Sequence, residues 1–268
     1  MISPLAYIHP DARLAPGVSV DPFTTIAADV EIGEGTWIGP NVTIMDGARI
    51  GAHCQIFPGA VVAGIPQDLK FAGEKTTAHV GDHTVLREYV TVNRGTVDRG
   101  ETRVGAHCLL QAYVHVAHDC LIGDNCVISG ATQIAGHVTI GDWGIIGGGT
   151  LVQQFVSIGA HAFVGGGSLV RKDVPPYVKA AREPLTYAGI NSVGLRRRGF
   201  GDEQVYAIQN LYRLLYLAGL NTQEALARIE EEVPVSAERD FATDFIRAAN
   251  RGIIKGPSKR KRDDEEGE

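Results

Sequence analysis

The sequence predicts an all-β solenoid, a parallel β-helix, with a small α-helical domain at its C-terminal end. The main observation is a branched aliphatic residue at every sixth position, often followed by glycine, as in Ile122-Gly123 and Ile140-Gly141. Neither the period of an α-helix nor simple alternation gives strict sixes over so many residues, whereas the hexapeptide repeat of a β-helix does. The second observation is that the period disappears after Val174-Pro175-Pro176. The aliphatic runs are Ile8 to Val62, Val80 to Val92 and Val104 to Val170.

The repeat assigns residues 1–174 to the solenoid. Each hexad makes one short strand and one turn, and three hexads close a triangular coil, so coils stack about 4.8 Å apart. Stacking buries an aliphatic ladder that no single coil could bury alone. The residue two positions before each aliphatic residue is usually small and tends inward, as at Cys108, Cys126 and Ala162.

Two breaks in the repeat predict surface loops, at residues 63–79 and 93–103. Both segments are polar and rich in glycine. Insertions into a solenoid project from its faces and often carry function.

Residues 175–255 are predicted to form the helical domain. Gly219 stops the first helix, Asn221 caps the second, and Pro234 ends it. Residues 256–268 form a block of opposite charges, which is typical of a disordered tail, although its Lys/Arg run could bind an anion. The predicted helices are Asp202 to Ala218, Thr222 to Val233 and Phe241 to Ala249.

The composition, 44% hydrophobic and 21% charged, is that of an ordinary soluble globular chain. No apolar stretch approaches the roughly 18 residues of a membrane span, and no signal peptide opens the sequence. We therefore expect a cytoplasmic location, no integral membrane segment and no nucleic-acid partner. The four cysteines lack metal-like spacing, so we expect them to be small, buried and reduced.

The period also predicts which side chains are neighbours, because positions 18 apart lie one above the other. Three of the nine histidines fall in one such patch, together with an aspartate, a glycine and a glutamine. Each histidine alone is better explained as an ordinary surface residue, but the combination indicates a catalytic site. The patch contains His115, His118, Asp119, Gly136, His137 and Gln154.

This patch suits acyl transfer to a hydroxyl group. A neutral imidazole at His118 could remove the proton from the acceptor oxygen, and Asp119 could hold the tautomer and orientation of the ring. The backbone N–H of Gly136 could donate to a developing oxyanion, because a missing side chain lets a thioester carbonyl approach. No Ser or Cys is arranged as a nucleophile beside this histidine, so direct transfer is expected.

Several motifs together resemble the acyl-ACP:UDP-N-acetylglucosamine O-acyltransferases of lipid A biosynthesis. The resemblance covers residues 1 to about 254, and its motifs are specific in combination, because many unrelated transferases share the hexad alone. The matching segments are His115-Val116-Ala117-His118-Asp119-Cys120, Ala135-Gly136-His137-Val138, Pro66 to Glu74, Asp173 to Tyr177, Gly189-Ile190-Asn191 and Gly194 to Phe200.

The resemblance implies a left-handed β-helix and a homotrimer with active sites between subunits, working without metal or cofactor. It implies transfer of a 3-hydroxyacyl chain from acyl carrier protein to the glucosamine 3-position of UDP-N-acetylglucosamine, the first step of lipid A biosynthesis. His118 becomes the general base and Gly136 the oxyanion donor. The implied substrate-binding residues are Gln67, Asp68, Lys70, His115, His137, Gln154, Asn191, Arg197 and Arg198.

A column of glycines, Gly130, Gly148 and Gly166, repeats at the coil length. These glycines could simply relax turns, or they could leave bare backbone on which an acyl chain lies. In the resembling family the position of Gly166 gauges chain length, and Phe163 matches a residue at the far end of the groove. A longer 3-hydroxyacyl donor is therefore expected.

Two residues depart from the family pattern. Gln153 stands where well-known members carry a histidine, and Val193 where many carry an acidic residue. They leave open whether the acceptor carries a 3-hydroxyl or a 3-amino group. A sister N-acyltransferase of the same pathway usually adds an N-terminal uridine-binding domain, whereas the hexads here begin at Ile8.

Two further alternatives belong to other classes. A metal-dependent β-helix hydratase requires three converging histidines, which this patch has in number, but it gives Asp119 and Gly136 no role. A non-catalytic scaffold leaves the histidine cluster unexplained.

Overall fold

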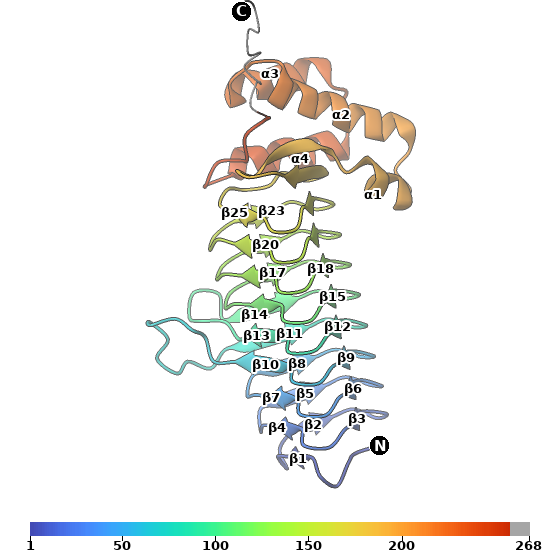
Figure 1. The fold of residues 1–268 in the computed structure, drawn as a ribbon, viewed down its shortest axis with the longest axis vertical. Helices are drawn as coiled ribbons and strands as arrows, with labels where there is room; N and C mark the ends of the chain where they lie inside the picture. The colour runs from blue at the N-terminus through green and yellow to red at the C-terminus, as the bar shows by residue number, and fades with distance from the viewer. Residues whose placement is uncertain (258–268) are drawn as a thin grey trace, which may run out of the picture.

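The computed structural model describes residues 1–257, which form a three-sided column of stacked coils with helices across one end (Figure 1). Successive strands up to β25 enter three sheets in turn, so each strand from β1 to β22 pairs in parallel with the strand three places further along the chain. The predicted parallel β-helix with a C-terminal helical domain is confirmed. Most of the predicted disordered tail, residues 258–268, lies outside the described residues.

The three sheets have nine, eight and ten strands within the described residues. The nine-stranded sheet contains β1 (Tyr7–Ile8), β4 (Thr25–Ile26), β7 (Thr43–Ile44), β10 (Val61–Gly64), β13 (Thr91–Asn93), β16 (His115–Val116), β19 (Gln133–Ile134), β22 (Leu151–Val152) and β25 (Leu169–Val170). The eight-stranded sheet contains β2 (Arg13–Leu14), β5 (Val30–Ile32), β8 (Ala48–Ile50), β11 (Thr77–Val80), β14 (Glu101–Val104), β17 (Leu121–Ile122), β20 (Thr139–Ile140) and β23 (Ser157–Ile158). The ten-stranded sheet contains β3 (Ser19–Val20), β6 (Trp37–Ile38), β9 (Gln55–Ile56), β12 (Val85–Leu86), β15 (Leu109–Leu110), β18 (Val127–Ile128), β21 (Ile145–Ile146), β24 (Phe163–Val164), β26 (Val178–Ala181) and β27 (Thr186–Ile190).

The core is the ladder of hexad aliphatics. Ile26, Leu110 and Ile146 are fully buried, and burial of each such side chain contributes about 1.5–3 kcal/mol. All four cysteines are buried and unpaired, as predicted. The backbone N–H of Cys126 lies 3.4 Å from the sulfur of Cys108, which confirms that these positions stack in adjacent coils.

The turns between sheets form the three corners of the column. The turns that lead from the nine-stranded to the eight-stranded sheet form the first corner. Those from the eight-stranded to the ten-stranded sheet form the second corner, and those from the ten-stranded back to the nine-stranded sheet form the third. Most turns hold one residue in the left-handed region, with φ of 60° at Asp119 in the first corner and 59° at His161 in the second. Asp, Asn and His tolerate this conformation better than most residues, so polar side chains gather in columns along the corners.

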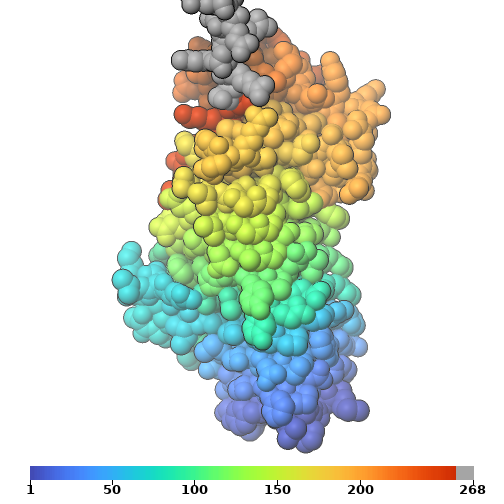
Figure 2. Space-filling model, in the orientation of Figure 1, coloured from blue at the N-terminus to red at the C-terminus, as the bar shows by residue number. Residues whose placement is uncertain are grey.

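Both breaks in the repeat are insertions at the first corner. The first loop joins β10 to β11 and projects from the column, as the cyan segment of Figures 1 and 2 shows. It places Arg49 opposite His79, 30 residues apart in place of the usual 18. The second loop joins β13 to β14, and residue pairs across it, such as His79 and Arg103, are 24 apart. Strands extend into the ends of both predicted loop ranges.

The C-terminal domain contains more than the three predicted helices. β26 continues the ten-stranded sheet in parallel with β24, and β27 returns antiparallel to β26. The first helix, which we did not predict, is capped by Asn191, and the last begins four residues before the predicted start because Ser236 caps it. No helix in residues 1–257 has the length and apolarity to cross a bilayer. The helices are α1 (Ser192–Arg197), α2 (Asp202–Leu217), α3 (Thr222–Glu232) and α4 (Ala237–Ala248).

Candidate active site

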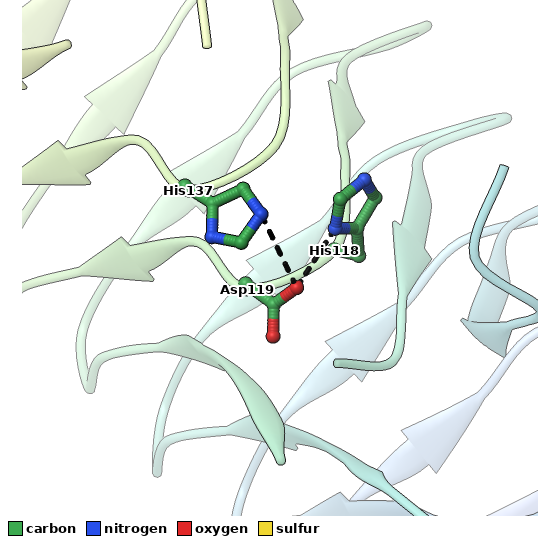
Figure 3. A group of neighbouring side chains, drawn as sticks. All are labelled: His118, Asp119 and His137. Carbon is green, nitrogen blue, oxygen red and sulfur yellow. Dashed lines mark hydrogen bonds and ion pairs between the residues drawn. The ribbon is translucent and has the colours of Figure 1, made fainter. Parts of the chain in front are cut away.

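A histidine and an aspartate form a dyad at the first corner, in the turn between β16 and β17. The Nδ1 atom of His118 lies 2.8 Å from Oδ2 of Asp119 (Figure 3). Asp119 is completely buried, whereas the side chain of His118 keeps 13% of its surface exposed. Because Nδ1 faces the carboxylate, Nε2 is the ring atom that can accept a proton from outside.

The Asp119 carboxylate is held in its charged form. Burial alone raises the pKa of a carboxyl group, but here hydrogen bonds from His118 and Thr96 outweigh burial, so the pKa of Asp119 lies below its ordinary value. Thr96 donates to both oxygens, with its N–H at 3.0 Å from Oδ1 and its hydroxyl at 2.7 Å from Oδ2. The predicted orienting role of Asp119 therefore has the required geometry.

His137 sits one coil further along on the same corner. Its Nε2 lies 3.7 Å from Oδ2 of Asp119, and its ring is perpendicular to that of His118, with centroids 5.2 Å apart (Figure 3). The ring of Phe155 stacks on its other side at 4.5 Å. His137 is thus fixed between the carboxylate and an aromatic ring.

Gly136 stacks directly on the His118 ring, as the period predicted. A Cβ at this position would lie 2.7 Å from Cε1 and 2.8 Å from Nε2 of His118, so any side chain would displace the ring. The Gly136 N–H donates to no partner within residues 1–257. The position therefore combines an open approach to Nε2 with an available backbone donor.

A surface cavity of about 430 Å³ opens over the dyad. It is lined by Gln67 of the first loop and by His118 and Gln154 on the column, so these residues border one cavity. Asp68 and Lys70 follow Gln67 in that loop, where the Lys70 N–H donates to the Asp68 carboxylate at 2.9 Å. The cavity is lined by Gln67, His115, Ala117, His118, Gln133, Ile134, Ala135, Gly136, Leu151, Val152 and Gln154.

His115 lines the same cavity from β16. Its Nδ1 lies 2.7 Å from the Thr91 hydroxyl. Burial, and secondarily the neighbouring His118, lower the pKa of His115, so this ring favours its neutral form. Of the glutamine pair two coils further along, Gln154 lines the cavity and Gln153 does not.

The ligand atoms of His118, Asp119 and His137 all lie within 4.8 Å of one another, close enough for a metal ion. Both Asp119 oxygens, however, already accept hydrogen bonds from Thr96, and Nδ1 of His118 is at direct hydrogen-bond distance from Oδ2. These contacts are those of an orienting dyad. Metal-free chemistry stays a prediction.

The residues predicted to meet the nucleotide lie at the second corner of the same chain, not beside His118. The Asn191 amide donates to the His161 carbonyl at 2.9 Å, and its oxygen caps α1. Arg198 lies over the Trp143 ring at 5.0 Å and 3.4 Å from Nδ1 of His161. Arg197, in the last turn of α1, is exposed. One chain therefore does not bring this set to the dyad.

The glycine column forms the third corner. A Cβ on Gly166 would lie 3.1 Å from the Gly148 oxygen, and one on Gly148 would lie 3.1 Å from the Gly130 oxygen, which confirms the predicted stacking. Phe163 is half-buried in β24, on the ten-stranded sheet beside this corner. The nine-stranded face, with Leu151 exposed in the cavity, separates the glycine column from the dyad.

Three contacts of the site were missed by sequence reasoning. Thr96 and Thr91 reach Asp119 and His115 across the second loop, at separations the 18-residue period does not connect. Phe155 stacks on His137, and here the period was a usable signal, because the two positions are 18 apart.

Comparisons with known proteins agree with this geometry. Residues 29–64 and 101–132 match the family model described as "Bacterial transferase hexapeptide (six repeats)". Residues 173–254 match the model described as "Udp N-acetylglucosamine O-acyltransferase; Domain 2". The two matches correspond to parts of the β-helix and to the C-terminal domain.

Similar proteins match over nearly the full chain. An acyl-[acyl-carrier-protein]–UDP-N-acetylglucosamine O-acyltransferase of Sulfurihydrogenibium is 55% identical, covering 97% of this chain and 96% of its own. The protein of the same name from Trichlorobacter lovleyi is 52% identical over 94% and 98% of the two chains. The crystal structure of a UDP-N-acetylglucosamine acyltransferase from Bacteroides fragilis superposes with a TM-score of 0.94 at 50% identity, covering 95% of this chain and 100% of that one.

Proposed function

The chain belongs to the family of acyl-[acyl-carrier-protein]–UDP-N-acetylglucosamine O-acyltransferases, and from this premise we propose that it transfers a 3-hydroxyacyl chain from acyl carrier protein to the 3-hydroxyl of UDP-N-acetylglucosamine in lipid A synthesis. The observation that carries the proposal is the dyad under an open cavity. His118 Nε2 faces the glycine that leaves room for a thioester, and Asp119 holds the opposite nitrogen.

The imidazole of His118 carries out both proton transfers of the reaction. Nε2 of His118 takes the proton of the sugar 3-hydroxyl while that oxygen attacks the thioester carbonyl. The buried Asp119 carboxylate accepts a hydrogen bond from the Nδ1–H group of His118 and stabilises the imidazolium that forms. Collapse of the tetrahedral intermediate breaks the C–S bond, and His118 returns the proton to the departing thiolate. No covalent acyl-enzyme is formed.

Gly136 supplies the oxyanion donor. Its N–H has no partner in residues 1–257 and lies at the surface where the carbonyl oxygen gathers charge. Removing one such donor elsewhere typically costs about 10²–10³ in kcat. Gln67, His115 and Gln154 line the cavity that receives the substrates, with Gln154 toward the acyl group. His137, Asp68 and Lys70 are assigned to the sugar nucleotide or the head of the donor through the family resemblance.

The active unit in this proposal is a homotrimer with sites between subunits. The supporting observation is that Asn191, Arg197 and Arg198 lie at a different corner from the dyad. The fork of an arginine suits a nucleotide diphosphate, but one chain cannot present these groups and His118 to a single substrate. A neighbouring chain in cyclic symmetry brings the second corner of one subunit to the first corner of the next.

The test is a donor and acceptor assay. Purified protein is incubated with UDP-N-acetylglucosamine and 3-hydroxyacyl carrier proteins of several lengths, and product is identified by mass spectrometry. An ester product with release of free carrier thiol is expected, unaffected by a chelator. An amide formed on a 3-amino acceptor, with the hydroxyl sugar inert, or inactivation by the chelator, would overturn the proposal.

A further inference from the structure

The second loop, residues 94–100, interrupts the repeat at the first corner, directly beside the dyad. Its third residue, Thr96, is 5% exposed and precedes Asp119 by 23 positions. We propose that Thr96 is a positioning residue that clamps Asp119 against His118 and so sets the geometry of proton transfer. This inference rests on the proposed function.

Thr96 holds the Asp119 carboxylate through two hydrogen bonds. The Thr96 N–H donates to Oδ1 of Asp119 at 3.0 Å, and the Thr96 hydroxyl donates to Oδ2 at 2.7 Å. The Asp98 N–H in turn donates to the Thr96 hydroxyl oxygen at 3.3 Å, so the hydroxyl proton is left for the carboxylate. Two donors on two oxygens fix the rotation of the carboxylate, which one donor alone could not do.

The backbone of the loop holds Thr96 in place. The Gly100 N–H donates to the Thr96 carbonyl at 2.7 Å, and the Gly95 N–H donates to the Thr77 carbonyl at 3.0 Å. Gly95 packs so closely on the backbone of Glu101 that a Cβ has no room. These contacts therefore hold Thr96 in a fixed position relative to the column.

The loop also binds the backbone at the other end of the aspartate. Arg99 donates to the Asp119 carbonyl at 3.1 Å, and the Thr102 hydroxyl, just after the loop, accepts from the Asp119 N–H at 2.8 Å. Two further ionisable groups face this site, His137, whose Nε2 lies 3.7 Å from Oδ2 of Asp119, and Asp98, whose carboxylate lies 3.9 Å from the same His137 nitrogen. Thr96 is the residue among these that donates to both carboxylate oxygens.

The decisive variant is Thr96→Val, which keeps the size and shape of the side chain and the backbone N–H but removes the hydroxyl. We expect kcat to fall about ten- to a hundredfold, which corresponds to the loss of a hydrogen bond to a charged group, with KM for both substrates unchanged. Removing this donor raises the pKa of Asp119. The less stabilised carboxylate attracts the His118 imidazolium more strongly, so the base is held in its protonated form and the acid limb of the pH profile of kcat moves to higher pH.

Two further variants separate positioning from folding. Thr96→Ser restores the hydroxyl and is expected to recover at least a third of kcat and the original pH profile. Thr84→Val removes an equally buried hydroxyl at the second corner, one that donates to the Gly105 carbonyl at 2.7 Å. It is expected to lower the melting temperature without changing kcat or the profile.

The outcomes distinguish this inference from the proposed function. If His118→Ala is inactive while Thr96→Val keeps the kcat and acid limb of the wild type, the clamp is refuted and the dyad stands. If Thr96→Val and Thr84→Val lose kcat equally, or serine fails to rescue, Thr96 is only structural. If His118→Ala remains active, the proposed function itself fails.

Discussion

The first and second corners of the column both carry a histidine in the same kind of turn, but opposite charges surround them. At the first corner His118 contacts a buried carboxylate at 2.8 Å. At the second, the Nδ1 atom of His161 lies 3.4 Å from the Arg198 guanidinium. Burial, and then Arg198, lower the pKa of His161 to about 4.

The difference shows that the partner, not the fold, decides what a corner histidine does. A carboxylate stabilises the imidazolium, so a proton taken from a hydroxyl can be held during reaction. A guanidinium penalises the imidazolium, so His161 remains neutral and serves as a hydrogen-bond and packing partner for Arg198 and Tyr177. The two histidines occupy adjacent positions of the repeated turn, since His161 takes the left-handed position that Asp119 holds beside His118. The partner of His118 lies within the repeat, whereas the partner of His161, Arg198, comes from the C-terminal domain.

Removal of the histidine at the first corner is expected to have the largest effect on activity. His118→Ala is expected to reduce kcat by about 10²–10⁴, because it removes the general base. The residue is at the surface of the site, so circular dichroism should be unchanged. The matched control is His107→Ala at the second corner, where an exposed ring stacks on His83 at 4.8 Å. Comparable losses in the two variants would refute the assignment of the base.

A bulky residue at the third corner tests whether this corner, which contains neither His118 nor His161, selects the length of the acyl chain. Gly166→Met is expected to shift preference toward shorter donors by about ten- to a hundredfold, at about 0.8 kcal/mol for each of two or three excluded methylenes. Gly166 has no left-handed φ, so a side chain requires only a small shift of the Gly148 oxygen, which would lie 3.1 Å from the new Cβ. Gly166→Ala should give a smaller shift in preference in the same direction. Competition between donors of different length measures the ranking. An unchanged ranking means that the glycines only relax turns.

Mixing variants of the two corners tests whether they meet across subunits. Arg198→Ala is expected to lower kcat/KM for the sugar nucleotide about ten- to a hundredfold, mostly through KM. Trimers reassembled from equal amounts of His118→Ala and Arg198→Ala chains should recover about a quarter of the wild-type activity, because a quarter of the interfaces then combine both intact corners. Each variant reassembled with itself is the control. No recovery in trimers of confirmed mixed composition would place both sets in one chain.

The hexad predicted the coil, the core and the vertical columns, because a buried aliphatic at each sixth position is a direct requirement of stacking. It therefore placed Gly136 above His118 correctly. It could not place Thr96 against Asp119, since loop insertions change the register and the path of a loop depends on tertiary contacts. β26 pairs with β24 without a hexad, and α1 is too short for a periodic signal, so neither was predicted.

The smallest expected effect concerns stability at the second corner. The pKa of His161 is lowered to about 4 in the folded chain, whereas an unfolded histidine titrates near 6.5. Between those values the unfolded state binds more protons, so the free energy of unfolding falls as pH drops from about 6.5 toward 4.

His161→Gln removes this titration. Because solvent screens the half-buried ring, we expect the stability difference between wild type and variant to change by only about 1 kcal/mol between pH 7 and pH 5. Urea unfolding at the two pH values measures it. Parallel pH dependence in the two proteins would mean that Arg198 does not penalise the imidazolium, and the contrast between the corners would then lose its electrostatic basis.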